Sequence, residues 1–120
     1  MSWWVSVNRM EEVPIIVNKF EAGGTYTLGG SRSADLNVTY NYSLHYYRVL
    51  GLEAGIRGLD GVSAVDALPI LTKGIAALGN DQSNDYWEPT EGNAKAALEI
   101  LQDWCEQAVE DGRPAVVRVH

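Results

Sequence analysis

The stretch "ADLNVTYNYSLHYYRVLG" (residues 34–51) changes its hydrophobic period midway, and this change decides the fold class. Its first half alternates apolar and polar side chains, which is the pattern of a strand with one buried face. The apolar members are Leu36, Val38, Tyr40 and Tyr42. From Asn41 or Ser43, both good N-caps, the spacing becomes helical. The apolar helical positions are then Leu44, Tyr47 and Leu50. The stretch predicts a strand running into a helix that stops at Gly51.

Further strands are predicted on both sides of this stretch. Trp3, Val5 and Val7 alternate with polar residues, and residues 13–20 form a β-branched run with Pro14 at its edge. A polar connection between these two runs predicts a hairpin. Residues 23–30 form a short strand between glycine pairs, and the glycine-rich segment 51–61 reads as a loop.

Two more helices and a last strand complete the prediction. The first helix is expected to start at Asp66, because Pro69 then falls in the first turn, whereas a start at Ser63 would bend the helix at Pro69. The second runs from Glu91 to about Glu110 behind a Thr90 cap, with an apolar stripe opposite an acidic one. Residues 115–120 form the final strand. The expected fold is a single α+β domain, residues 1–120, in which a small antiparallel sheet of N-terminal strands plus the C-terminal strand packs against about three helices.

Charge and composition exclude several functions. The net charge is −7, and residues 81–111 hold nine acidic residues and one base, which gives −8 there and leaves +1 elsewhere. A nucleic-acid binder needs the opposite sign, so direct nucleic-acid binding is not expected. No apolar run approaches the roughly 18 residues of a membrane span, and the N-terminus lacks a signal-peptide pattern. We therefore expect a cytoplasmic protein. The single cysteine, Cys105, cannot form an intrachain disulfide.

The first candidate site is the polar edge of the stretch 34–51. Asn37, Thr39 and Asn41 are in line at period two and could read the hydrogen-bonding edges of a ligand, although a solvent-facing strand has the same pattern. We expect the two sequon-like triplets at Asn37 and Asn41 to be chance matches, because the triplet matters only in a secreted chain and a cytoplasmic chain is expected here. The tyrosines 40, 42 and 47 read as core. His45 and Tyr46 fall outside the buried pattern and are expected at the surface.

The second candidate site is the connector "SNDYWEPTEGNAK" (residues 83–95). Asp85 and Trp87 come just before a helix N-terminus, where free N–H groups favour anions, but the aromatic residues could equally be a hydrophobic plug. Arg57 on the glycine loop would meet an anionic group.

Catalytic templates are not found in the sequence. Two histidines cannot build a three-histidine zinc site, there is no nucleophile elbow, and Cys105 lies on a buried stripe, so no catalytic residue, metal or cofactor is expected. Hydrolysis by Asp35 and Asp85 remains an alternative without support from their spacing. The acidic helix stripe is an alternative partner surface for a basic protein.

Three phrases carry a resemblance to a known family: "ADLNVTYNYSLHYY", "GIRGLDGVSAVDALPIL" and "DYWEPTEGNAKAALEIL". They resemble small uncharacterised proteins of bacteriophages and actinobacteria that share N-[ILV]-T-Y-N-Y, G-[IL]-R-x-L-x-G and D-Y-W-x-x-T-x-G-N-A segments. Some relatives carry an upstream cysteine pair that this chain lacks, so no metal role transfers. The resemblance implies a phage context and no known activity.

Taken together, the sequence predicts a small binding protein rather than an enzyme. The expected ligand is a nucleotide-like small molecule, bound by the polar edge 37–41 with His45, by Tyr46 and Trp87 as stacking residues, and by Arg57 and Asp85. The alternative is a protein-interaction or inhibitor module in which the acidic C-terminal helix engages a basic host protein. No membrane partner is expected, and self-association stays open.

Overall fold

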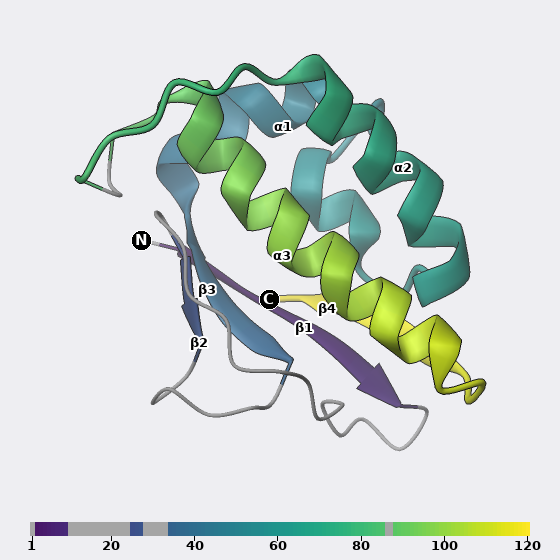
Figure 1. Ribbon diagram of the computed structural model, residues 1–120. Coiled ribbons are helices and arrows are strands. Elements are labelled where there is room, and N and C mark those ends of the chain that lie inside the picture. Colours follow the sequence, from purple (N-terminus) through teal and green to yellow (C-terminus); the bar gives the residue numbers. More distant parts are fainter. Residues whose placement is uncertain (1, 10–24, 28–33, 86–87) are drawn as a thin grey trace.

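A computed structural model describes residues 2–9, 25–27, 34–85 and 88–120 of the chain (Figure 1). Its strands are β1 (Ser2–Arg9), β2 (Thr25–Thr27), β3 (Asp35–Thr39) and β4 (Ala115–Val119). Its α-helices are α1 (Ser43–Val49), α2 (Ala64–Ala77) and α3 (Glu91–Glu110). Two short 3₁₀ helices, η2 (Tyr40–Tyr42) and η3 (Gly55–Leu59), flank α1 in the chain. The predicted α+β class is confirmed.

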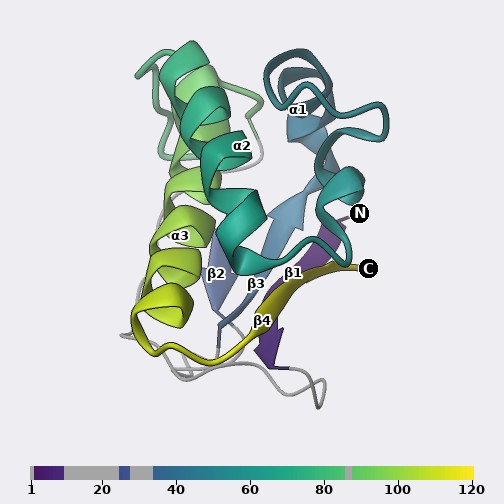
Figure 2. The ribbon, with the colours of Figure 1, turned by 90° about the vertical axis from the view of Figure 1, so that its right-hand side faces the viewer.

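The four described strands form one antiparallel sheet in the order β2-β3-β1-β4. In the centre of the sheet Val5 lies opposite Leu36 of β3 and opposite Val119 of β4. The predicted apolar face of β1 is confirmed, because Trp3, Val5 and Val7 are all buried in the core, but Ser6 and Asn8 of the other face are buried as well. Helices α2 and α3 lie side by side over this face (Figure 2). The strand and hairpin expected at residues 13–20 lie outside the described residues.

The edge strand β4 is closed by the segment that follows η3. Val117 donates its N–H to the carbonyl of Val62 at 2.8 Å and accepts from the N–H of Gly61 at 2.7 Å. Val119 donates to the side chain of Asp60 at 3.0 Å. Gly61 makes the turn with a φ of 82°, a conformation that favours glycine. These bonds occupy groups that could otherwise pair with a strand of another molecule.

The predicted start of α2 at Asp66 is wrong. Ser63 is the N-cap, and its hydroxyl accepts from the N–H of Asp66 at 3.1 Å. Ser63 also forms an isolated bridge with Val116 of β4, so a contact distant in sequence fixes the start of the helix. Pro69 therefore lies inside α2. The carbonyl that its missing N–H leaves free belongs to Val65, an exposed residue, and water can reach it.

Helix α3 follows its predicted pattern closely. Thr90 caps it by accepting from the N–H of Asn93 at 3.1 Å. All members of the predicted apolar stripe are buried: Ala94, Ala97, Leu98, Leu101, Cys105 and Ala108. Ile100 and Trp104 are also buried, so α3 contributes more than one stripe to the core. Burial raises the pKa of the Cys105 thiol to about 12, with a smaller effect from Glu106, and the thiol is therefore protonated at neutral pH.

The predicted orientation of α1 is wrong. The strand pattern ends at Thr39, which caps η2, and the helical phase begins at Tyr40 rather than at Leu44. Side chains of this phase that point into the core are Tyr42, Tyr46, Val49 and Leu50. Tyr40, Leu44 and Tyr47, which we expected in the core, are exposed, whereas Tyr46, which we expected at the surface, is fully buried.

Tyr46 joins α1 to the rest of the core. Its hydroxyl donates to the carbonyl of Ala94 in α3 at 3.1 Å. Its ring lies 6.1 Å from the ring of Tyr42, edge to face, and 6.2 Å from that of Trp3 in β1. Burial, with a smaller contribution from Tyr42, raises the pKa of the Tyr46 hydroxyl well above its usual range. The hydroxyl is thus a permanent donor at neutral pH.

Replacing this hydroxyl tests the orientation of α1. Tyr46→Phe removes a buried hydrogen bond and is expected to lower the free energy of unfolding by about 1–2 kcal/mol. Tyr47→Phe, the neighbouring control, removes an exposed hydroxyl and is expected to change it by less than about 0.5 kcal/mol. Urea unfolding followed by tryptophan fluorescence measures both. Equal effects of the two substitutions would contradict the orientation described.

Candidate functional site

The connector between α2 and α3 folds over the N-terminus of α3 (Figure 1). Its anchor is Asn93, a buried residue in the first turn of α3. The Asn93 side chain accepts from the N–H of Ser83 at 3.2 Å and donates to the carbonyls of Asp85 and Glu88 at 3.3 and 3.2 Å. The helix N-terminus, where the sequence suggested an anion site, is thus occupied by the chain itself.

Gly92 allows the connector to approach this closely. Its N–H donates to the carbonyl of Asp81 at 2.8 Å, and a Cβ at this position would lie 2.4 Å from that same oxygen. No side chain fits such a gap without moving the backbone. Lys95 adds a further tie by donating to the Asn80 side chain at 2.8 Å.

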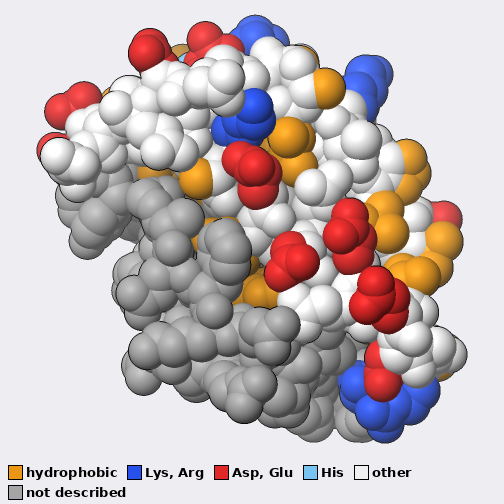
Figure 3. Space-filling model, in the orientation of Figure 1, with side chains coloured by type: hydrophobic (Ala, Val, Ile, Leu, Met, Phe, Trp, Pro, Cys, Tyr) orange, Lys and Arg blue, Asp and Glu red, His pale blue; other side chains and the backbone are white. Residues whose placement is uncertain are grey.

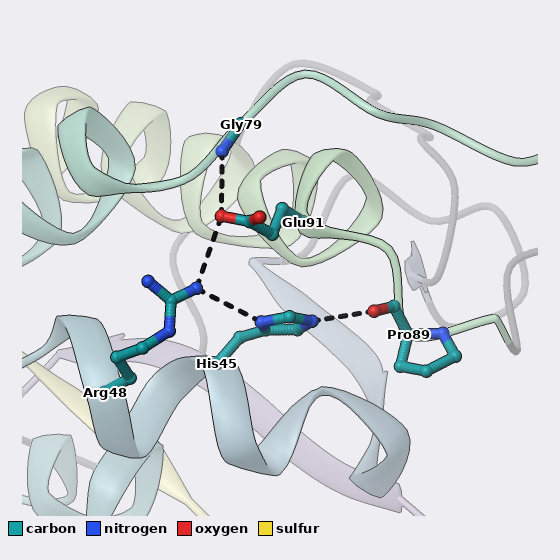
Figure 4. A network of polar contacts seen from close by, with 5 residues as sticks. All are labelled: His45, Arg48, Gly79, Pro89 and Glu91. Carbon is teal, nitrogen blue, oxygen red and sulfur yellow. Dashed lines mark hydrogen bonds and ion pairs between the residues drawn. The ribbon is translucent and has the colours of Figure 1, made fainter.

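A network of polar contacts holds α1 against this connector (Figure 4). His45 Nε2 donates to the carbonyl of Pro89 at 2.7 Å, and its Nδ1 then accepts from Arg48 at 3.4 Å. Arg48 also donates to Glu91 Oε1 at 3.2 Å, and the same oxygen accepts from the N–H of Gly79 at 3.2 Å. The network therefore joins α1 to both ends of the connector.

The carboxylate of Glu91 is stabilised by this network. The hydrogen bond from the Gly79 N–H, and then that from Arg48, lower the pKa of Glu91 below its ordinary value of 4.5. His45 is engaged at both ring nitrogens and Glu91 at its network-facing oxygen. The polar groups of His45, Arg48 and Glu91 therefore hold α1 against the connector.

The polar edge predicted as a ligand surface is largely covered. Asn37 and Thr39 are buried, Asn37 donates to the hydroxyl of Ser2 at 2.6 Å, and Thr39 Oγ1 accepts from the N–H of Asn41 at 3.3 Å. Asn41 itself is exposed. Tyr46, proposed as a stacking residue, is buried and its ring is not available to a ligand.

The other predicted site residues are spread over different elements. His45 is half-buried and lies beside the connector that also carries Asp85. Arg57 is exposed on η3, which packs against α1 and β4, whereas the connector joins α2 to α3 (Figure 2). Trp87 and the side chain of Asp35 lie outside the described residues.

A pocket that the sequence did not indicate lies between the start of α2, the end of α3 and β4. Its volume is about 380 Å³. Its walls are mainly apolar and include Val65, Val109, Pro114 and the side chain of Arg113. Val65 and Val109 are 62% and 41% exposed, which is high for large apolar residues. We call this the C-terminal pocket.

The surroundings of the C-terminal pocket are acidic. Glu106 precedes Val109 by one helical turn and Glu110 follows it directly. With Glu99 and Asp103 they form a row of acidic side chains along α3, visible in Figure 3, that we call the α3 acidic face. No ion pair to this face is found among the described residues.

The cation at the pocket is already paired. Arg113 donates to Asp111 at 2.9 Å, and the same Asp111 oxygen binds Arg9 of β1 at 2.7 Å. These two contacts lower the pKa of the Asp111 carboxyl, Arg113 more than Arg9. Arg113 makes no ion pair with Glu106 or Glu110 among the described residues, and it shares the single carboxylate of Asp111 with Arg9.

No helix in the described part of the chain is long and apolar enough to cross a membrane, and no cluster of three or more His, Cys, Asp or Glu residues there could hold a metal ion. Comparison of the chain with protein-family models, with curated proteins and with solved structures finds no match. The resemblance to small phage and actinobacterial proteins stays a prediction.

The Glu91 network predicts a specific dependence of stability on pH. The folded carboxyl protonates at lower pH than the unfolded one, so its contribution is present above the ordinary pKa of 4.5 and is lost as the pH falls through the lower, folded value. Glu91→Gln is therefore expected to lose less stability than the wild type between pH 7 and pH 3. Urea midpoints across this range measure the difference.

Arg48→Ala serves as the companion variant. It removes the ion pair but leaves the Gly79 hydrogen bond, the larger cause of the shift, so its pH dependence is expected between those of the wild type and Glu91→Gln. Parallel curves for all three proteins would contradict the network described.

Proposed function

We propose that this protein is a protein-interaction module that binds a basic segment of a partner protein at the end of α3. The C-terminal pocket takes an apolar side chain of that segment, and the α3 acidic face takes its cationic side chains. The observation that carries the proposal is the position of two exposed valines, Val65 and Val109, in a pocket beside carboxylates that have no ion-pair partner among the described residues.

The pocket has the features of an interface anchor. Binding energy at protein interfaces concentrates where a few apolar side chains enter a pocket that excludes water. The walls here are held firmly: Ser63 is fixed by its cap and by its bridge to Val116, and Ala108 and Ala115 behind it are buried. A wall that does not rearrange loses little conformational entropy on binding.

The negative charge of α3 favours basic partners over acidic ones. Residues 81–111 carry a net charge of −8, and the exposed members of the α3 acidic face contribute to this field. Such a field speeds association with a basic partner and disfavours acidic ones, and salt screens it. Phosphate groups would be repelled at the same place, so the pocket suits a basic peptide better than a nucleotide.

Two alternatives stay predictions. A nucleotide-like ligand would have to be bound without the ring of Tyr46, which is buried, and at an edge where Asn37 and Thr39 are buried too. A carboxylate-dependent hydrolase has no supporting feature in the described residues, where Asp85 is exposed and takes part in the connector. A phage context, with a basic host protein as the target, is compatible with the module proposed.

Charge reversal on α3 tests the proposal. The probe is a set of fluorescent amphipathic peptides, each with several arginines around one central leucine, and anisotropy reports binding. The triple variant Glu99→Lys, Glu106→Lys, Glu110→Lys is expected to weaken binding of the peptides by about 10-fold or more, because it replaces attraction by repulsion along the whole contact. Added salt should weaken the wild type in the same direction.

A variant with the same change in net charge is the control. It carries Glu53→Lys, Asp81→Lys and Glu88→Lys, which are exposed positions outside α3. It is expected to bind the peptides within about 3-fold of the wild type, since the local contact is intact. If no peptide binds to the wild type, or if both triple variants weaken binding equally, the proposed function is wrong.

A further inference from the structure

A second apolar surface is exposed on η2 and α1. Tyr40, Leu44 and Tyr47 are 40%, 82% and 53% exposed. Leu44 and Tyr47 are three residues apart and lie on one face of α1, and Tyr40 precedes them in η2. We call them the α1 stripe. Together with Val65 and Val109 they are all of the large exposed hydrophobic residues in the described part of the chain.

The two tyrosines of the α1 stripe are held in place by neighbouring residues. The Tyr40 ring lies 4.7 Å from the ring of Trp3. The Tyr47 ring lies against Gly55, where an added Cβ would be 3.3 Å from the ring. On the inner face, Tyr46 fixes the helix to α3. A rigid aromatic surface of this kind is suited to binding, because little side-chain freedom remains to be lost.

The charges around the two apolar surfaces are opposite. Residues 40–57 contain two arginines, Arg48 and Arg57, and one acidic residue, Glu53. Arg48 is paired with Glu91, but Arg57 and Lys73 are exposed and have no ion pair among the described residues. Lys73 lies near Gly51, at the end of α1. The C-terminal pocket, in contrast, lies beside Glu106 and Glu110 in the acidic segment 81–111. The α1 stripe therefore has the chemistry that the proposed function assigns to the partner.

We propose that the partner is a second copy of this chain, whose α1 stripe docks in the C-terminal pocket of the first. The proposal rests on the proposed function, since it names the segment that fills the same pocket. Leu44, the most exposed side chain of the stripe, is the natural anchor between Val65 and Val109. Arg57 and Lys73 then face the α3 acidic face.

The positions of the two surfaces determine the kind of assembly. Figures 1 and 2 both place α1 at the end of the molecule opposite the start of α2, the end of α3 and the start of β4. One copy cannot fill its own pocket, and each contact leaves one stripe and one pocket free. Head-to-tail association of this type either closes into a ring or grows as a chain.

Complementary blocking of the two surfaces tests this arrangement. Leu44→Glu blocks the stripe and keeps the pocket, whereas Val109→Glu blocks the pocket and keeps the stripe. Both positions are exposed, so the fold is expected to survive, which circular dichroism checks. Sedimentation velocity from about 1 to 500 µM should show self-association of the wild type and monomers for each variant. An equimolar mixture of the variants should form a dimer, about twice the mass of either, because one working stripe meets one working pocket.

Controls separate this inference from the proposed function. Gln82→Glu adds the same negative charge at an exposed connector position and should associate like the wild type. Val65→Glu is a second pocket variant and should behave like Val109→Glu. A wild type and a mixture that both stay monomeric would overturn the inference, as would association that persists in both single variants.

Binding of the arginine-rich peptides then distinguishes a failure of the self-association alone from a failure of the proposed function. If the monomeric wild type and Leu44→Glu bind them while Val109→Glu does not, the interaction module stands and only the second copy as its partner is wrong. If none of the proteins binds a peptide, the proposed function falls as well.

Discussion

The structure depends on how α1 is fixed to the core by Tyr46. The buried hydroxyl donates to Ala94 of α3, and the ring packs near Trp3 of β1. A helix this short has little stability of its own, so this attachment determines which of its faces points outward. With Tyr46 inside, His45 reaches the carbonyl of Pro89 and the α1 stripe is left exposed. The contact of His45 with the connector and the exposed α1 stripe both follow from this orientation of α1.

Elements with a long, regular period could be predicted from the sequence. The apolar face of β1 and the stripe and cap of α3 were predicted correctly, because each pattern repeats often enough to fix its phase. For α1 the prediction was wrong, because η2 inserts one turn between strand and helix and shifts the phase. The start of α2 was also wrong, since the position of Ser63 is set by β4, far along the chain.

The candidate site was harder to predict from the sequence than the fold. The C-terminal pocket combines segments around Val65, Val109 and Val116, which no local pattern connects. The one signal in the sequence was that Val65 and Val109 fall outside the apolar stripes of their helices. The acidic residues that surround the pocket were recognised as a partner surface, and the pocket gives that surface an apolar anchor. Because Asp60, Gly61 and Val62 close the edge of β4, association at this end must use side chains rather than strand pairing.

In the proposed assembly, two apolar surfaces in surroundings of opposite charge meet between copies of the chain. Methyl NMR of leucine and valine side chains during dilution tests this contact most directly, because it reports on both surfaces in one sample. If the contact forms, the Leu44 and Val109 signals shift together with concentration, while those of the buried Val5 and Leu71 stay constant. Signals of Leu44 and Val109 that do not change with concentration, or a shift of one without the other, would contradict it.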